Sequence, residues 1–194
     1  MQYRTHVTTT LAITLPLMVA TNTLSFVSLG AVALGTVFPD IDEPHSWIGA
    51  RTRGISDLIH AFFGHRGITH SLVGLTLAFL TVLLMTTLTP FNLMTGLFFV
   101  FGYGLHLIED SFSKSGVKWL LPLTNKNYQF GNGFYYTTGG LIENFILLGA
   151  VIILLIEFKT LNLVNANLFD FNIPTIISEL FIKVQILSEK IIKH

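Results

Sequence analysis

The residues with the clearest chemical potential form the string HRGITHS at residues 65–71, directly before a long apolar run. Placing two histidines and an arginine at the start of a membrane-length segment costs free energy, unless these side chains have a binding partner or a function. Neutral imidazole is a common ligand for borderline divalent metals. Metal ligation is therefore the first chemistry that this string indicates.

The spacing of the two histidines limits how they can act together. His65 and His70 are five residues apart, which on a regular helix separates them by about 140°. They cannot chelate one ion side by side from such a helix. Either His65 lies in the loop before the helix begins, or the two histidines serve different metals.

Two further clusters carry metal-ligating side chains. Asp40 and Asp42 follow an apolar segment, where two carboxylates can converge on a cation or share two cations, or simply end a helix in solvent. His106 and Asp110 are four residues apart and lie about 40° from each other on a helix, so they share a face. Asp110 is expected either to ligate the metal or to orient His106.

The composition is typical of a membrane protein. Of 194 residues, 51% are hydrophobic and 11% are charged, against about 25% charged in an average soluble domain. The formal net charge of zero gives no reason to expect nucleic acid as a partner. Since the chain has no cysteine, disulfides and thiolate sites are excluded, and any metal must use His, Asp and Glu.

The apolar segments predict an all-α fold, a polytopic membrane bundle of about five spans with a polar metal-binding cap on one face. Residues 8–20 and 24–38 form either a helical hairpin, which we favour, or one bent segment, and Gly30 and Gly35 would allow close helix contact. The later spans are residues 68–89, 91–107 and 141–158. We expect a membrane-embedded metal-site domain over residues 1–160 and a tail over 161–194, with an amphipathic surface helix at 173–194.

Alternating topology would bring the polar clusters to the same side of the membrane. If the chain begins with a hairpin, one end of each of the five spans lies on that face. The same face then carries His6, Asp40, Asp42, His65, His70, His106, Asp110 and Glu143. If the first two segments are one span, His6 leaves the site. Arginines and lysines in the same short loops favour the cytoplasmic side of a bacterial cell membrane.

Two residues outside the expected metal ligands are candidates for catalysis beside the metal. Arg66 could bind a phosphate or carboxylate with its planar guanidinium, although an interfacial anchor or a salt bridge to Asp57 would also explain it. Glu143 either interacts favourably with the positive end of the helix dipole at a helix start, or contributes to the site from the same face.

The motifs resemble a known family. Gly35, the Pro-Asp-Ile-Asp at residues 39–42, the string at 65–71, and His106 with Asp110 are similar to the YdjM/YbcI family of predicted membrane-bound, inner-membrane metal-dependent hydrolases. The likeness runs from about residue 6 to residue 143. It implies a membrane-bound hydrolase with a metal site on these residues.

The expected function is a metal-dependent hydrolase that cleaves a phosphoester of a lipid or lipid-linked substrate at the membrane surface. Two ions about 3.5–4 Å apart would suit that reaction, with Arg66, Asp42 and Glu143 as catalytic candidates. Zinc is the expected metal, with manganese and iron as alternatives. The alternative function is a non-catalytic membrane protein that binds or transports a divalent metal. The metal ligands are expected to be His6, Asp40, Asp42, His65, His70, His106 and Asp110.

Overall fold

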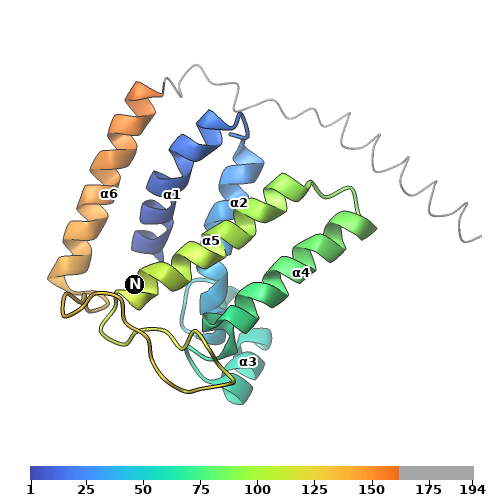
Figure 1. Cartoon of the computed structure of the whole chain (residues 1–194), viewed down its shortest axis with the longest axis vertical. Helices are drawn as coiled ribbons and strands as arrows, with labels where there is room; N and C mark the ends of the chain where they lie inside the picture. The colour runs from blue at the N-terminus through green and yellow to red at the C-terminus, as the bar shows by residue number, and fades with distance from the viewer. Residues whose placement is uncertain (162–194) are drawn as a thin grey trace, which may run out of the picture.

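The computed structural model describes residues 1–161, and over this range the fold is all-helical, as predicted (Figure 1). Six α-helices and three short 3-10 helices follow one another as α1 (Tyr3–Ala20), α2 (Phe26–Val37), η1 (Phe38–Asp42), η2 (Gly49–Arg51), α3 (Ile55–Phe63), η3 (Ile68–His70), α4 (Leu72–Leu88), α5 (Leu93–Ser111) and α6 (Leu141–Thr160). The described residues contain no β-strand. Two isolated bridges, Ser113 to Tyr136 and Val117 to Tyr128, hold the loop between α5 and α6.

The first two apolar segments form a hairpin of two helices, which confirms the favoured alternative. The chain leaves α1 at Thr21 and re-enters a helix at Phe26. Ser25 is the N-cap of α2, and its hydroxyl accepts a hydrogen bond of 3.0 Å from the amide of Ser28. The capping group explains why a new helix starts here instead of α1 continuing with a bend.

Helix α2 packs closely along α5, and glycines make the approach possible. A Cβ on Gly35 would lie 1.9 Å from the carbonyl oxygen of Phe99, and one on Gly102 would lie 2.4 Å from that of Val32. Larger side chains would therefore force the two backbones apart. The expectation for Gly35 is confirmed, whereas that for Gly30 is wrong, since nothing lies within 4 Å of its Cβ position.

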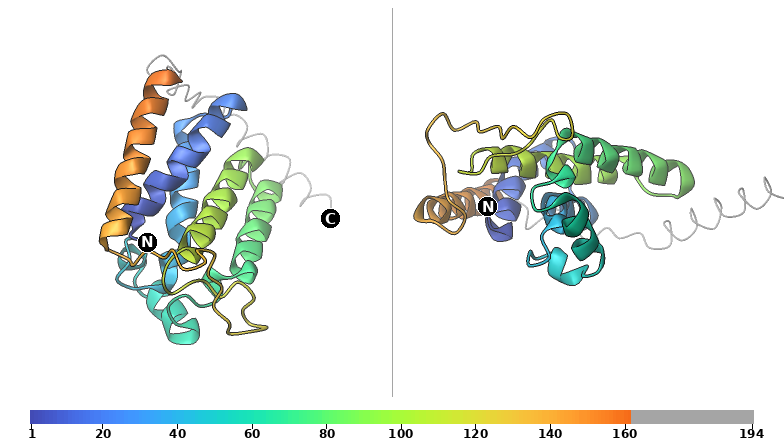
Figure 2. Two further views of the ribbon diagram at one scale, coloured as in Figure 1. Left: turned by 60° about the vertical axis from the view of Figure 1, so that its left-hand side comes forward. Right: turned by 90° about the horizontal axis from the view of Figure 1, so that it is seen from below.

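The helices alternate in direction, so α1, α4 and α6 begin at the end of the molecule where α2 and α5 finish (Figure 1). This end also holds α3 and the loop that connects α5 to α6, and Figure 2 shows the same arrangement from two further sides. Helix α5 runs to Ser111 rather than ending near residue 107. His106 and Asp110 therefore both lie on helix.

Within residues 1–161, α6 is the one helix long and apolar enough to cross a membrane by length and composition. Only 11% of its apolar window is buried, so most of that surface faces outward. Helix α4 is apolar but has 17 residues, and α2 has 12. Of the five expected spans, this criterion therefore supports one, α6. The amphipathic helix expected at 173–194 lies outside the described residues.

Candidate metal centre

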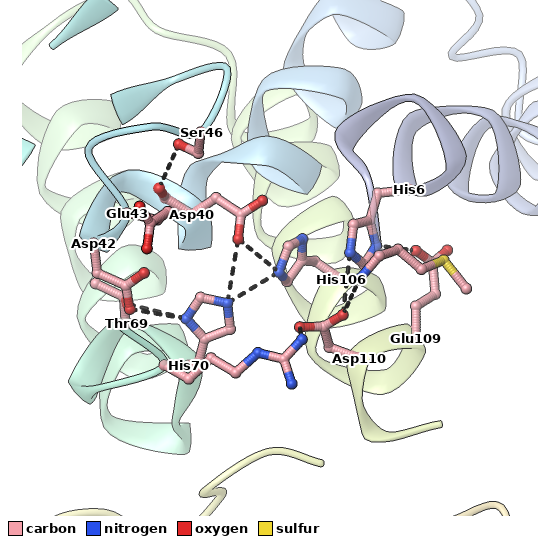
Figure 3. A network of polar contacts seen from close by, with 12 residues as sticks. His6, Asp40, Asp42, Glu43, Ser46, Thr69, His70, His106, Glu109 and Asp110 are labelled. Carbon is pink, nitrogen blue, oxygen red and sulfur yellow. Dashed lines mark hydrogen bonds and ion pairs between the residues drawn. The ribbon is translucent and has the colours of Figure 1, made fainter. Parts of the chain in front are cut away.

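Two groups of possible metal ligands meet at the polar end of the bundle (Figure 3). One group is His6, His106 and Asp110, and the other is Asp40, His70 and His106. In each group, one ligand atom from every residue lies within 4.8 Å of the others. His106 belongs to both groups, so the two form one continuous cluster.

The five ligands come from four elements of the chain. Helix α1 supplies His6 close to its start, and α5 supplies His106 and Asp110 on one face near its end. Asp40 lies in η1. Pro39 cannot continue the hydrogen bonding of α2, so the chain goes on from α2 as a tighter 3-10 helix. His70 closes η3, directly before Ser71, the N-cap of α4.

The centre of the cluster is an arrangement of buried imidazoles around a carboxylate. The Nε2 atoms of His70 and His106 lie 3.2 Å apart, and both side chains are fully buried. The Oδ1 atom of Asp40 lies 3.5 Å from the first nitrogen and 3.7 Å from the second. Three potential donors of electron pairs therefore point toward a common space.

Asp42 lies behind His70 and fixes the orientation of its ring. Its Oδ2 accepts hydrogen bonds from Nδ1 of His70 at 3.0 Å, from the Thr69 hydroxyl at 2.5 Å and from the Gly67 amide at 3.2 Å. Because Nδ1 carries the proton in this contact, Nε2 is the nitrogen left to ligate. A carboxylate that binds the far nitrogen of a histidine is the usual support of a metal ligand.

Glu109 performs the corresponding role for His6. Its Oε2 accepts from Nδ1 of His6 at 2.5 Å, while Oε1 accepts from the hydroxyls of Thr9 at 2.7 Å and Thr10 at 3.2 Å. Glu109 and these threonines were not predicted from the sequence. The available signal was a glutamate three residues after His106 at the end of a mostly apolar helix, which places it near the same face.

Asp110 connects the first group to Arg66. Its Oδ2 lies 2.5 Å from Nη2 of Arg66, whose Nη1 donates to the Ser113 hydroxyl and the Gly116 carbonyl, each at 3.0 Å. Its Oδ1 lies 3.3 Å from Nε2 of His6. The partner of Arg66 is therefore Asp110, and not Asp57.

The electrostatics of η1 and η3 favour a positive charge at the cluster. Burial lowers the pKa of His70, but hydrogen bonds to Asp40 and Asp42 outweigh it and raise the pKa to about 9. Burial raises the pKa of Asp40, but His106 and His70 outweigh it and bring the pKa down to about 2. The same balance, with hydrogen bonds from His65 and His70, lowers the pKa of Asp42.

Four predicted site residues lie outside the two ligand groups. Asp42 and Arg66 each contact a group member as described above. His65 lies in the loop before η3, as one of the two alternatives required, with its Nδ1 3.2 Å from Oδ1 of Asp42. Glu143 is buried at the start of α6, where it accepts from the amides of Gln2 at 2.5 Å and Gly139 at 2.6 Å.

Comparison with known proteins finds two relatives of different length. Inner membrane protein YdjM of Escherichia coli (strain K12) is 37% identical over 92 residues, which is 46% of this chain and 46% of that protein. The uncharacterized protein YvsG of Bacillus subtilis (strain 168) is 32% identical over 117 residues, 60% of this chain and 69% of its own length. The chain therefore aligns with about half the length of YdjM.

No solved structure matches this chain. The sequence model described as YdjM inner membrane protein matches residues 1–176. The match covers most of the chain, including every residue of both ligand groups. The chain therefore belongs to the YdjM inner membrane protein family.

Proposed function

We propose that this chain is a membrane-bound metal-dependent hydrolase that cleaves a phosphoester of a lipid or lipid-linked substrate at the membrane surface. The observation that carries the proposal is the pair of ligand groups that share His106 at the polar end of the bundle. A cluster of this kind suits two adjacent ions, an arrangement common in enzymes that cleave phosphoesters.

The residues present fit a divalent metal. Among the described residues, Nδ1 of His106 is a buried nitrogen without a hydrogen-bond partner, and Nε2 of His6 has only the 3.3 Å contact with Asp110, although buried polar atoms normally have a hydrogen bond. The donors are all imidazole and carboxylate, a set that suits zinc, with manganese and iron as alternatives. When bound, such an ion supplies a Lewis acid that activates water and stabilises negative charge on a phosphoryl group.

The surrounding residues would prepare the site for that chemistry. Asp42 and Glu109 hold one imidazole each, so that two ligands are oriented before the metal binds. Arg66 holds Asp110 and places a permanent positive charge beside the first group. An anionic phosphoester would be attracted to this charge.

The membrane arrangement is part of the proposal. Five helices, α1, α2, α4, α5 and α6, would form the membrane domain of residues 1–160, with the metal cluster at headgroup level on the cytoplasmic side. Because the sequence has no cysteine, Arg53→Cys and Lys118→Cys each introduce a unique label site. Both should react with an impermeant maleimide only when the cytoplasmic face is accessible. Labelling from the outside in intact cells would contradict the orientation.

Hydrolysis itself is tested with purified protein in lipid nanodiscs that contain phosphatidate. We expect phosphate release that depends on added zinc or manganese and stops on chelation. The alternative, a metal-binding or transporting protein without catalysis, would bind the same ions but release no phosphate. Activity that persists after complete removal of metal would contradict the proposed mechanism.

A further inference from the structure

Two apolar grooves flank helix α5 and adjoin each other. The first has a volume of about 520 Å³ and lies against α4, and the second has a volume of about 490 Å³ and lies against α6. Both are lined by Leu105 and Ile108 of α5. The two grooves therefore meet at these two side chains, beside the last turns of that helix.

The groove residues follow one stripe on each helix. On α1, Thr9, Ile13 and Leu17 are spaced by four residues and so share a face. The α5 stripe repeats at intervals of three and four residues, the helical period, through Met94, Phe98, Phe101, Leu105 and Ile108. From Met94 to Ile108 this stripe is about 21 Å long at ~1.5 Å per residue.

We call the two grooves along α5 together the path. The two ends of this path differ in chemistry. Near Met94 the lining is apolar throughout. At the other end the second groove is lined by Glu109, which orients His6, and by Thr9, whose hydroxyl donates to Glu109. A ligand that fills the path must therefore be apolar along its length and polar at the end beside the metal cluster.

We propose that this path binds one hydrocarbon chain of a phospholipid substrate, with its phosphoester at the metal cluster. The path is longer than the depth of one leaflet, which is half of a hydrocarbon core of about 30 Å. Ile13, Phe101 and Ile108 are each at least 40% exposed, so the chain can enter sideways from the bilayer. This inference rests on the proposed function and names its substrate class.

Gly104 allows the path to be filled without disturbing the bundle. It lines the first groove, and the nearest atom to its Cβ position is Cδ1 of Leu75 at 4.0 Å. Gly104→Leu should therefore occupy groove volume while the helix gains propensity. Gly149→Leu on α6 is the matched control, because it makes the same change on a helix at a position with nothing within 4 Å.

The experiment compares dipalmitoyl and dioctanoyl phosphatidate as substrates of the metal-loaded protein in nanodiscs. Gly104→Leu should lower the ratio of long-chain to short-chain turnover by roughly tenfold, and Gly149→Leu should keep the wild-type ratio. An unchanged ratio in Gly104→Leu would overturn the inference.

A second measurement separates binding from catalysis. Palmitoyl phosphatidate with a diazirine at the chain terminus should cross-link to residues 94–101, and unlabelled dipalmitoyl phosphatidate should compete. Adducts concentrated on Phe145 and Leu148 of α6, or on another protein copy, would overturn the groove assignment. If wild-type protein hydrolyses neither substrate, the proposed function fails, while the cross-link map still decides the groove.

Discussion

The Nε2 atoms of His70 and His106 lie 3.2 Å apart, although the two residues belong to η3 and α5 and are 36 positions apart in the chain. Both side chains are fully buried, and Asp40 faces both nitrogens. Two imidazole nitrogens at this distance can share one proton or one cation, but each cannot carry its own proton toward the other. The contact is therefore suited to a site that exchanges a proton for a metal ion.

Asp42→Asn should weaken metal binding by about 10- to 100-fold, the usual effect of removing an orienting carboxylate. The amide keeps the shape of the side chain but loses the charge that holds Nδ1 of His70. Asp57→Asn is the matched control, since Asp57 is exposed and bonds only the Gly54 amide at the start of α3. Titration of both variants with zinc measures the difference, and equal affinity would contradict the orienting role of Asp42.

Glu109→Gln and Glu143→Gln should have different effects, although both residues are buried glutamates. Glu109→Gln should weaken metal binding, because it loosens His6. Glu143→Gln should leave metal affinity unchanged and lower the free energy of unfolding by about 1–3 kcal/mol, since its carboxylate accepts from two backbone amides. Loss of metal in Glu143→Gln with retained stability would instead show that Glu143 contributes to the metal site.

The sequence predicted the convergence of the site better than its internal roles. Alternation of apolar segments was enough to bring His6, Asp40, His70 and His106 to one end. Spacing could not separate ligands from supporting residues, because Asp40 and Asp42 are two positions apart in a 3-10 helix and contact opposite nitrogens of His70. The role of Glu109 could not be predicted in the same way, because only its contact with His6, which is 103 positions away in the chain, distinguishes it from its neighbour Asp110.

Metal binding near neutral pH should release about one proton per ion bound beside His70. The folded pKa of about 9 lies above the usual value of about 6.5, so His70 is protonated at pH 7 in the metal-free protein. This protonation stabilises the metal-free fold fully below about pH 6.5, and the effect is lost as the pH rises through about 9. Metal affinity should therefore rise between pH 7 and 9. Calorimetry in two buffers of different ionisation enthalpy measures the proton, and a pH-independent affinity would contradict the assignment.

Arg66→Lys should retain metal but lower phosphatidate turnover by roughly tenfold or more. Lysine preserves the charge, but its point-like ammonium cannot reach Asp110, Ser113 and Gly116 together as the guanidinium does. Arg53→Lys is a control on an exposed arginine outside the cluster. Turnover equal to wild type, with metal content confirmed in each sample, would move Arg66 from the active site to an anchoring role.

The central claim, that the shared cluster binds metal, is tested most directly by elemental analysis of the purified wild type, His106→Ala and His45→Ala. His106 belongs to both ligand groups, whereas His45 is exposed and belongs to neither. We expect wild type and His45→Ala to hold the same amount of a transition metal, which chelation removes, and His106→Ala to hold almost none. Equal metal in a folded His106→Ala variant, or no metal in the wild type after zinc loading, would contradict the account.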